Sequence, residues 1–276
     1  MKYVILGIVQ GLTEFLPVSS SGHLVIFQHM LGITQDVVFL DIVLHLGTLC
    51  SLLAYFRRDV YVLVANFITA ITDMIFRRRL FSVWRYDDRF RLSVYIIIAT
   101  LITGVIVKSG KHFFESQFES LPTVIIGLFI TSVILFLTKN FYFGQRFLKH
   151  LTIKDAIIAG LAQTLAVIPG ISRSGATISA LLFRNIDSDS AFNLSFLMSI
   201  PAILGAFLFK FKEVDLAQRS VSIFNLSLGF IASFITGLFA IYFARLVIKS
   251  KNFYKFSYYC FIVAVIVLIL KLNHIL

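Results

Sequence analysis

Apolar residues dominate the chain, and they gather in runs separated by short polar or basic stretches. Several runs approach the roughly 20 residues that an α-helix needs to cross the hydrocarbon core of a bilayer. They lack the alternation of apolar and polar residues that is typical of a membrane β-barrel. The pattern therefore predicts an all-α polytopic membrane protein. Its six transmembrane helices are expected at residues 37–56, 92–107, 122–137, 191–209, 224–244 and 256–270.

A further apolar run, residues 60–76, is interrupted by polar side chains such as Asn66 and Asp73. We interpret it as an amphipathic helix at the membrane interface or packed on the bundle, with a seventh span as the alternative. Lys and Arg are concentrated in the loops on one side of the six spans, and the positive-inside rule places those loops in the cytoplasm.

Two other apolar segments are too short to span and are broken in the middle. The first has half helices at residues 3–16 and about 21–31, separated by Pro17 and a serine run. The second has half helices at 155–168 and 176–183. Irregular backbone at membrane depth is tolerated only where it is buried in protein or lines a cavity. We therefore predict two re-entrant helix-loop-helix hairpins.

The two broken segments are copies of each other. A shift of 153 positions aligns identical residues at Gly7 and Gly160, Gln10 and Gln163, Leu12 and Leu165, Ser19 and Ser172, Ser21 and Ser174, and Gly22 and Gly175. We predict a single integral membrane domain, 1–276, built as an inverted-topology repeat: repeat one about 1–138, a basic linker 139–152, and repeat two about 153–276. Proteins with such repeats bind substrate near the midplane of the membrane.

Composition agrees with this class. Charged residues make up 14% of the chain, against about 25% in a soluble domain, and the mean hydropathy is +0.91. The net charge of +11 is explained by basic cytoplasmic loops, so we expect no nucleic-acid partner. Cys50 and Cys260 lie inside apolar runs and are interpreted as core residues, forming neither a disulfide nor a metal site. Residues 1–16 are not followed by a signal-peptide cleavage site.

The first hairpin carries the most reactive side chains. Gln10 and Glu14 share one helix face, Ser19, Ser20 and Ser21 follow in the loop, and His23 opens the next half helix. Polar groups are costly in hydrocarbon, which makes this cluster a candidate functional site. Structural explanations compete: each glutamine could serve helix–helix packing, and a serine could merely cap a helix. His45 and Asp41, within the first span, are interpreted as structural or supporting residues.

The second hairpin carries Arg173 at the position equivalent to Ser20, flanked by Ser172 and Ser174 and followed by Thr177. Each second half helix begins at its loop, and helix N-termini bind anions, phosphate above all. Arginine recognises phosphate through two parallel hydrogen bonds. If the loops meet, the sequence predicts an anionic, phosphate-bearing ligand.

Both motifs resemble signatures of a known family, the BacA-type undecaprenyl-diphosphate phosphatases. Gln10-x-x-x-Glu14 fits (Glu/Gln)-x-x-x-Glu, and the segment from Pro169 to Thr177 fits Pro-Gly-x-Ser-Arg-Ser-x-x-Thr at every fixed position. The resemblance covers essentially the whole chain. It implies hydrolysis of undecaprenyl diphosphate to the monophosphate, recycling of the lipid carrier for peptidoglycan synthesis, and bacitracin resistance. It also implies a divalent cation (Mg²⁺ or Ca²⁺), a multi-pass location in the inner (plasma) membrane, and six spans plus two re-entrant hairpins.

Carried onto this chain, the resemblance gives each motif residue a role. Arg173, Ser172, Ser174 and Thr177 hold the diphosphate, with Gln10, Ser19 and Ser21 as further substrate-binding residues. Ser20 attacks the terminal phosphorus, with Ser19 or water as alternative nucleophiles. His23 or Glu14 removes the serine proton, and Glu14 could instead hold the metal. Gln10 stands where some members have Glu, which weakens any mechanism that needs two carboxylates there.

A second class of function remains open at this level: a transporter or flippase of a phosphate-bearing lipid carrier, because inverted repeats with broken helices are typical of transporters. A purely structural membrane scaffold would not need these loops. Membrane lipid is expected around the spans. The sequence leaves open whether the protein forms a homodimer.

Overall fold

The computed structural model describes all residues except 34–36, 78–86, 118–119, 142–143, 212–220 and 276. The described part is helical apart from loops and one isolated bridge between Arg146 and Ile186. Its α-helices are α1 (Lys2–Phe15), α2 (Ser20–Leu31), α3 (Val37–Tyr55), α4 (Arg57–Arg77), α6 (Asp88–Ser109), α7 (Lys111–Gln117), α8 (Leu121–Leu137), α9 (Ile153–Leu165), α10 (Arg173–Phe183), α11 (Ser188–Phe211), α12 (Ile223–Lys249) and α13 (Phe256–Leu272).

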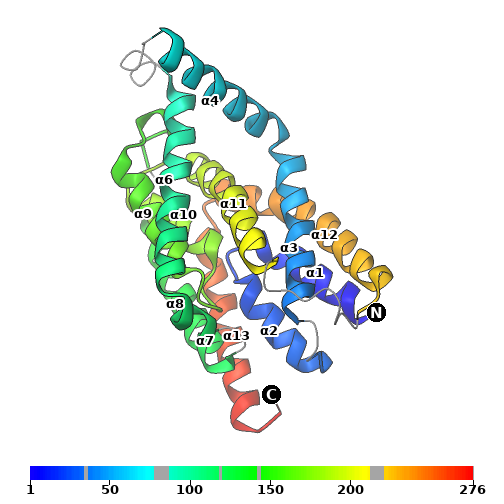
Figure 1. Ribbon diagram of the computed structural model, residues 1–276. Coiled ribbons are helices and arrows are strands. Elements are labelled where there is room, and N and C mark those ends of the chain that lie inside the picture. Colours follow the sequence, from blue (N-terminus) through cyan, green and yellow to red (C-terminus); the bar gives the residue numbers. More distant parts are fainter. Residues whose placement is uncertain (34–36, 78–86, 118–119, 142–143, 212–220, 276) are drawn as a thin grey trace.

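The all-α polytopic class is confirmed. Among the described residues, 7 helices are long and apolar enough to cross a membrane. Six of them are the expected spans, α3, α6, α8, α11, α12 and α13, and the additional one is α4. Only 6% of the apolar window of α4 is buried in the protein, and Figure 1 shows this helix running obliquely at one end of the bundle. Length and composition alone would let α4 span, so its interfacial placement stays a prediction.

Two helix-loop-helix hairpins stand beside the long helices. The helices of the first, α1 and α2, have 14 and 12 residues, and those of the second, α9 and α10, have 13 and 11. None of the four reaches the length of a span. The first break follows Leu16, which is extended, and the second contains Gly170 at a φ of 92°. The insertion of these hairpins into the membrane as re-entrant elements stays a prediction.

Glycine lets each hairpin approach a long helix closely. α1 lies alongside α12 and α9 packs on α6 (Figure 1). A Cβ at Gly7 would collide with the carbonyl oxygen of Gly229, and one at Gly160 would lie 2.8 Å from the carbonyl oxygen of Ala99. The two glycines are equivalent in the aligned copies, and close backbone approach explains both. The division into repeats and linker stays a prediction, and residues 142–143 of the linker lie outside the described residues.

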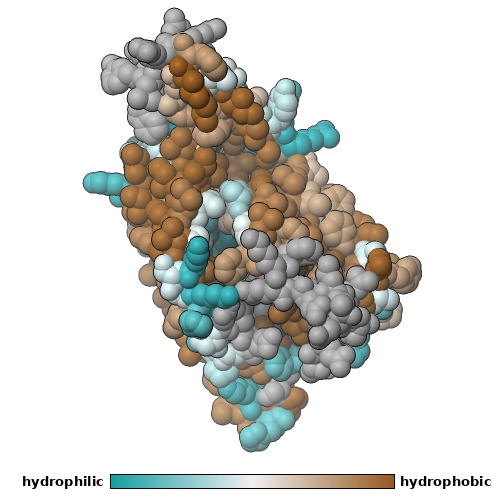
Figure 2. Space-filling model, viewed as in Figure 1, coloured by the Kyte–Doolittle hydropathy of each residue, from teal (hydrophilic) through white to brown (hydrophobic). Residues whose placement is uncertain are grey.

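Most of the described surface in view is hydrophobic, as expected of helices that face lipid (Figure 2). The same view shows a small hollow with polar residues in the middle of this hydrophobic face. Inside, aromatic rings pack around the end of α1: Phe196 of α11 stacks on Phe15 at 5.6 Å and on Phe192 at 4.2 Å between ring centroids. Cys50 and Cys260 are both free in this structure. The packing of these aromatic rings fixes the C-terminal turn of α1, which carries Glu14.

A buried charge cluster lies at the open end of the second hairpin, opposite its loop. Asp155, in the first turn of α9, is fully buried. Arg146 donates to both of its carboxylate oxygens, at 3.2 and 2.5 Å, Arg184 donates at 2.9 Å and the Thr152 hydroxyl at 2.7 Å. Burial alone would raise the pKa of Asp155, but these hydrogen bonds outweigh it and lower the pKa from 3.8 to about 2. The cluster therefore ties the ends of α9 and α10 to the preceding loop.

Candidate active site

Glu14 is the centre of the candidate site. It lies one turn after Gln10 on the same face of α1, and both side chains are buried. The Ser20 hydroxyl donates to Glu14 Oε2 at 2.5 Å, Gln10 Nε2 donates to the same oxygen at 2.9 Å, and Arg173 Nη2 donates to Oε1 at 2.6 Å. A buried carboxylate needs such partners to remain charged. The structure thus joins four of the residues that the sequence singled out.

Arg173 reaches Glu14 because the two loops touch. The Ser174 hydroxyl donates to the carbonyl oxygen of Leu16 across the junction, at 3.2 Å. A Cβ at Gly22 would lie only 3.2 Å from the Cα of Gly170, so the loop backbones are in close contact. One site is therefore assembled from both hairpins, with the arginine coming from the second and the carboxylate from the first.

The other loop serines mainly hold the loops in shape. Ser19 and Ser172 each accept a hydrogen bond from the backbone N–H three residues later, which caps α2 and α10. Each also pairs with the serine two residues on, Ser21 or Ser174, at 3.3 Å in both copies. Ser19, Ser172 and Ser174 are buried, whereas Ser20 is partly exposed. Ser20 is thus the loop hydroxyl that both contacts Glu14 and remains accessible.

Two threonines fix the backbone around Arg173. The Thr131 hydroxyl donates to the Gly170 carbonyl at 2.8 Å and accepts from the Ser172 N–H at 3.0 Å. The Thr177 hydroxyl donates to the Arg173 carbonyl at 2.8 Å, and Thr177 is fully buried. Thr177 was expected to bind substrate, but in this structure its hydroxyl supports the loop. Thr131, inside an apolar span, gave no sequence signal.

His23 does not face the Ser20 hydroxyl. Its Nδ1 lies 2.8 Å from the carbonyl oxygen of Ser19, and its Nε2 lies 2.9 Å from the hydroxyl of Tyr259. The side chain is buried. Of the two bases suggested for Ser20, the structure therefore brings Glu14 and not His23 into hydrogen-bond distance. Tyr259 was not anticipated, because it lies in an apolar span.

His45 of α3 was interpreted from the sequence as a structural or supporting residue, but it lies close to Glu14. Its Nε2 lies 3.7 Å from Glu14 Oε2, while its Nδ1 donates to the Asp41 carbonyl at 2.7 Å. The imidazole is one-third exposed, so it borders the accessible side of the site. Its position within a membrane span, four residues from Asp41, was the available signal.

The donor set near Glu14 suits a hard cation only if substrate completes the coordination. Among the residues that the structure describes, no three His, Cys, Asp or Glu side chains form a metal-binding group. One carboxylate is present, and the Gln10 amide oxygen is buried without a hydrogen-bond partner. Mg²⁺ is commonly held by one or two carboxylates together with substrate phosphates. Glu14 and Gln10 therefore fit an ion that arrives with a diphosphate.

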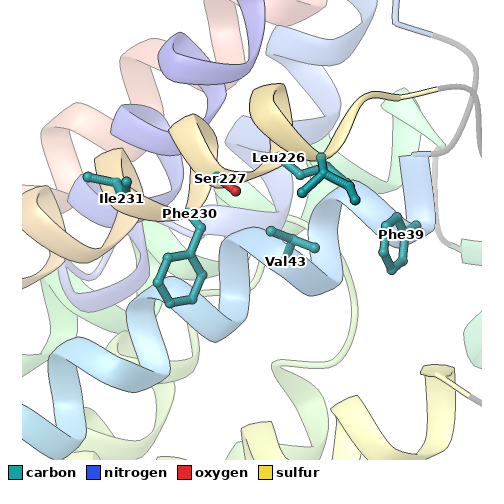
Figure 3. Close-up of a pocket in the computed structure, with 7 residues that line it drawn as sticks. Phe39, Val43, Leu226, Ser227, Phe230 and Ile231 are labelled. Atoms are coloured by element: carbon teal, nitrogen blue, oxygen red, sulfur yellow. The ribbon is translucent and has the colours of Figure 1, made fainter.

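An apolar hollow of about 510 Å³ lies away from these polar groups, between the N-terminal halves of α3 and α12. Figure 3 shows Phe39 and Val43 of α3 beside Leu226 and Phe230 of α12, with Ile231 further along α12. Val43 is two residues before His45, so the two side chains leave the helix on nearly opposite faces. The same helix thus borders both the polar site and the apolar hollow.

Comparison with known proteins agrees with the motifs. The family model described as bacitracin resistance protein BacA matches residues 3–266. An undecaprenyl-diphosphatase of Alkaliphilus metalliredigens is 42% identical over 274 residues, covering 98% of both chains. One of Methanobrevibacter smithii is 40% identical over 99% of this chain and 98% of its own. One of Syntrophotalea carbinolica is 40% identical over 94% of each chain. The chain belongs to the bacitracin resistance protein BacA family.

Proposed function

We propose that this protein hydrolyses undecaprenyl diphosphate to undecaprenyl phosphate and inorganic phosphate. The observation that carries the proposal is the junction of the two loops, where Ser20 and Arg173 contact opposite oxygens of Glu14. The names of the relatives support the same substrate. The consequence in the cell is recycling of the peptidoglycan lipid carrier at the inner (plasma) membrane, and with it resistance to bacitracin.

Binding relies on positive charge and backbone donors that converge at the junction. Both α2 and α10 begin at this junction, and helix N-termini favour anions. Arg173 has five N–H donors, so it can turn part of its guanidinium from Glu14 to a phosphate. Its side chain is 17% exposed, which leaves it accessible to a ligand. Ser172 and Ser174 support this loop, and Ser21 adds a partly exposed hydroxyl beside Ser20.

The chemical step follows from the contact between Ser20 and Glu14. A serine hydroxyl is a weak nucleophile until a base removes its proton, and Glu14 Oε2 lies 2.5 Å from it. Ser20 Oγ forms a bond to the terminal phosphorus, its proton passes to Glu14, and the P–O bond to undecaprenyl phosphate breaks. Water then attacks the phosphorus of the phosphoserine, the Ser20 oxygen leaves and takes back the proton held by Glu14, and inorganic phosphate is released. Ser19 is disfavoured as the nucleophile because it is buried and its oxygen caps α2.

We include a divalent cation, Mg²⁺ or Ca²⁺, in the proposal. In the alternative to Glu14 acting as the base, Glu14 and the amide oxygen of Gln10 would hold this ion together with the diphosphate. Bound there, such an ion supplies neutralisation of phosphate charge.

The prenyl chain needs an apolar surface close to the polar site. The hollow between α3 and α12 is an apolar surface (Figure 3), and α3 also carries His45 of the polar site. We therefore propose that part of the chain lies there and the rest in the surrounding lipid.

Phosphate release from undecaprenyl diphosphate by purified protein in detergent tests the function. Glu14→Gln removes the base and is expected to lower kcat by about 10²- to 10⁴-fold. Arg173→Ala removes a charged donor and should cost about 10²- to 10³-fold. Gln10→Leu and Gln163→Leu form a matched pair, because only Gln10 contacts Glu14, whereas Gln163 donates to Thr103. We expect about a tenfold loss for the former and less than twofold for the latter.

Two results would contradict the proposal. Wild-type protein that binds the lipid but releases no phosphate, with and without Mg²⁺ or Ca²⁺, would instead support a transporter or flippase. Full activity of Ser20→Ala would exclude Ser20 as the nucleophile. Detection of phosphorylated Ser20 by mass spectrometry after rapid quenching would support it directly.

A further inference from the structure

The contact between His23 and the Ser19 carbonyl fixes the tautomer of the imidazole. A carbonyl oxygen can only accept, so His23 Nδ1, 2.8 Å from the Ser19 carbonyl, must carry the proton and donate it. In the neutral ring Nε2 is then an acceptor, and the Tyr259 hydroxyl donates to it at 2.9 Å. The two rings are also stacked, with an interplanar angle of 9°. Both ring nitrogens are thus occupied, and neither contacts Ser20.

The backbone that receives this hydrogen bond is strained. Ser19 has a φ of 68° and a ψ of 94°, whereas Ser172, its counterpart in the second hairpin, has a φ of −74°. Positive φ is unfavourable for a residue with a side chain and persists only where its surroundings enforce it. The Ser19 carbonyl accepts from the His23 backbone N–H at 3.1 Å as well as from its ring. Two donors from one residue therefore hold the orientation of this peptide group.

The different φ values of Ser19 and Ser172 coincide with different directions of the side chains that follow them, Ser20 and Arg173. After Ser19, the Ser20 hydroxyl points to Glu14 of its own hairpin, whereas after Ser172 the Arg173 side chain crosses to the other hairpin. The last helix of the chain, α13, also braces the first loop at a second point, where the Cys260 thiol lies 3.5 Å from the Pro17 carbonyl. Tyr259 and Cys260 are adjacent, so α13 contacts the loop before and after Ser19.

We propose that Tyr259 is a positioning residue for the hydrolysis, a role that rests on the proposed function. Through His23 it holds Ser19 at positive φ and so aims the Ser20 hydroxyl at Glu14. His23 in this role is a strut rather than the base. Since the effect concerns the attacking hydroxyl and not the grip on the diphosphate, it changes kcat and leaves KM nearly unaltered.

The test compares Tyr259→Phe with Tyr258→Phe in the phosphate-release assay on the full-length protein. Tyr258 is the neighbouring tyrosine, and its ring packs on Phe136 and Tyr254. Loss of one hydrogen bond is expected to lower kcat about tenfold in Tyr259→Phe, with KM within about twofold. Tyr258→Phe should match wild type. Equal unfolding midpoints of both variants in mixed micelles would exclude a folding defect.

Combining Tyr259→Phe with Ser19→Gly tests whether Tyr259 acts through the backbone conformation of residue 19. Glycine adopts positive φ without steric cost, so the strut should matter less when residue 19 is glycine. Tyr259→Phe is expected to cost less than about threefold in that background. An undiminished tenfold loss there, a change in KM instead of kcat, or full activity of Tyr259→Phe would overturn the inference while leaving the proposed function intact. Wild-type protein without phosphate release would overturn both.

Discussion

Asp155→Asn tests the buried charge cluster at the open end of the second hairpin, opposite its loop. The substitution preserves the shape of the side chain but removes its charge. It also replaces one acceptor oxygen by an amide that donates. Oδ2 accepts from Arg146, from the Thr152 hydroxyl and from the Thr152 N–H, so an amide group on that side would face donors. Arg146 and Arg184 would lose their shared partner.

The size of the effect follows from the pKa of Asp155, which falls from 3.8 to about 2. A difference of nearly two units corresponds to about 2 kcal/mol of folding free energy at neutral pH. Breaking a buried pair by removing one partner costs roughly 3–5 kcal/mol. Because Asn keeps some of the hydrogen bonds, we expect Asp155→Asn to lose about 2–3 kcal/mol.

Reversible unfolding by SDS in mixed micelles, followed by circular dichroism, measures this loss. Asp88→Asn is the matched control, because Asp88 also lies in the first turn of a helix and pairs with Arg91, but is half exposed. Such a surface pair contributes about 0–1 kcal/mol. The folded pKa of Asp155 is lowered, so its contribution is complete above pH 4 and disappears as the pH falls toward 2. The gap between wild type and Asp155→Asn should therefore narrow over that interval. A loss equal to that of the control, or a gap independent of pH, would refute the reasoning.

Two other substitutions test packing and loop support. Gly7→Ala should destabilise the protein by about 1–3 kcal/mol or more in the same unfolding experiment, because its Cβ would collide with Gly229. Gly104→Ala should not, since nothing lies within 4 Å of that position. Thr131→Val removes the acceptor of the buried Ser172 N–H, and we expect phosphate release to fall at least tenfold; unchanged kcat would exclude a role for this support.

Much of the architecture could be predicted from the chain, because lipid imposes a simple rule on length and polarity. The six spans and both broken hairpins follow from it, and the aligned copies indicated which residues share a site. Glu14, Ser20, Arg173 and Gln10 stood out because each is polar in an apolar surrounding. The placement of α4 could not be predicted with the same force, since its composition suits both the interface and a span.

Other parts of the site depend on tertiary contacts that leave no local trace. Tyr259 and Thr131 are separated from their partners by 236 and 41 residues, and each sits in an ordinary apolar run. His23 was one of two candidate bases for Ser20, with Glu14 as the other, because it follows the serines closely. The rotation of Ser19 to positive φ, which no sequence pattern signalled, turns Ser20 toward Glu14, while the hydrogen bonds of His23 occupy its ring with Ser19 and Tyr259.

The junction of the two loops also sets an order for biogenesis. Glu14 precedes Arg173 by 159 residues, so the first hairpin leaves the ribosome long before its counter-charge has been made. A buried carboxylate without its counter-charge is costly, even with the hydrogen bonds from Gln10 and Ser20. We therefore expect the nascent hairpin to stay in contact with water until the second half of the chain has inserted. An unfinished chain lacks Arg173 and cannot act on lipid. A chain truncated after the first half keeps the Glu14 carboxylate without its counter-charge, which is unfavourable in the membrane.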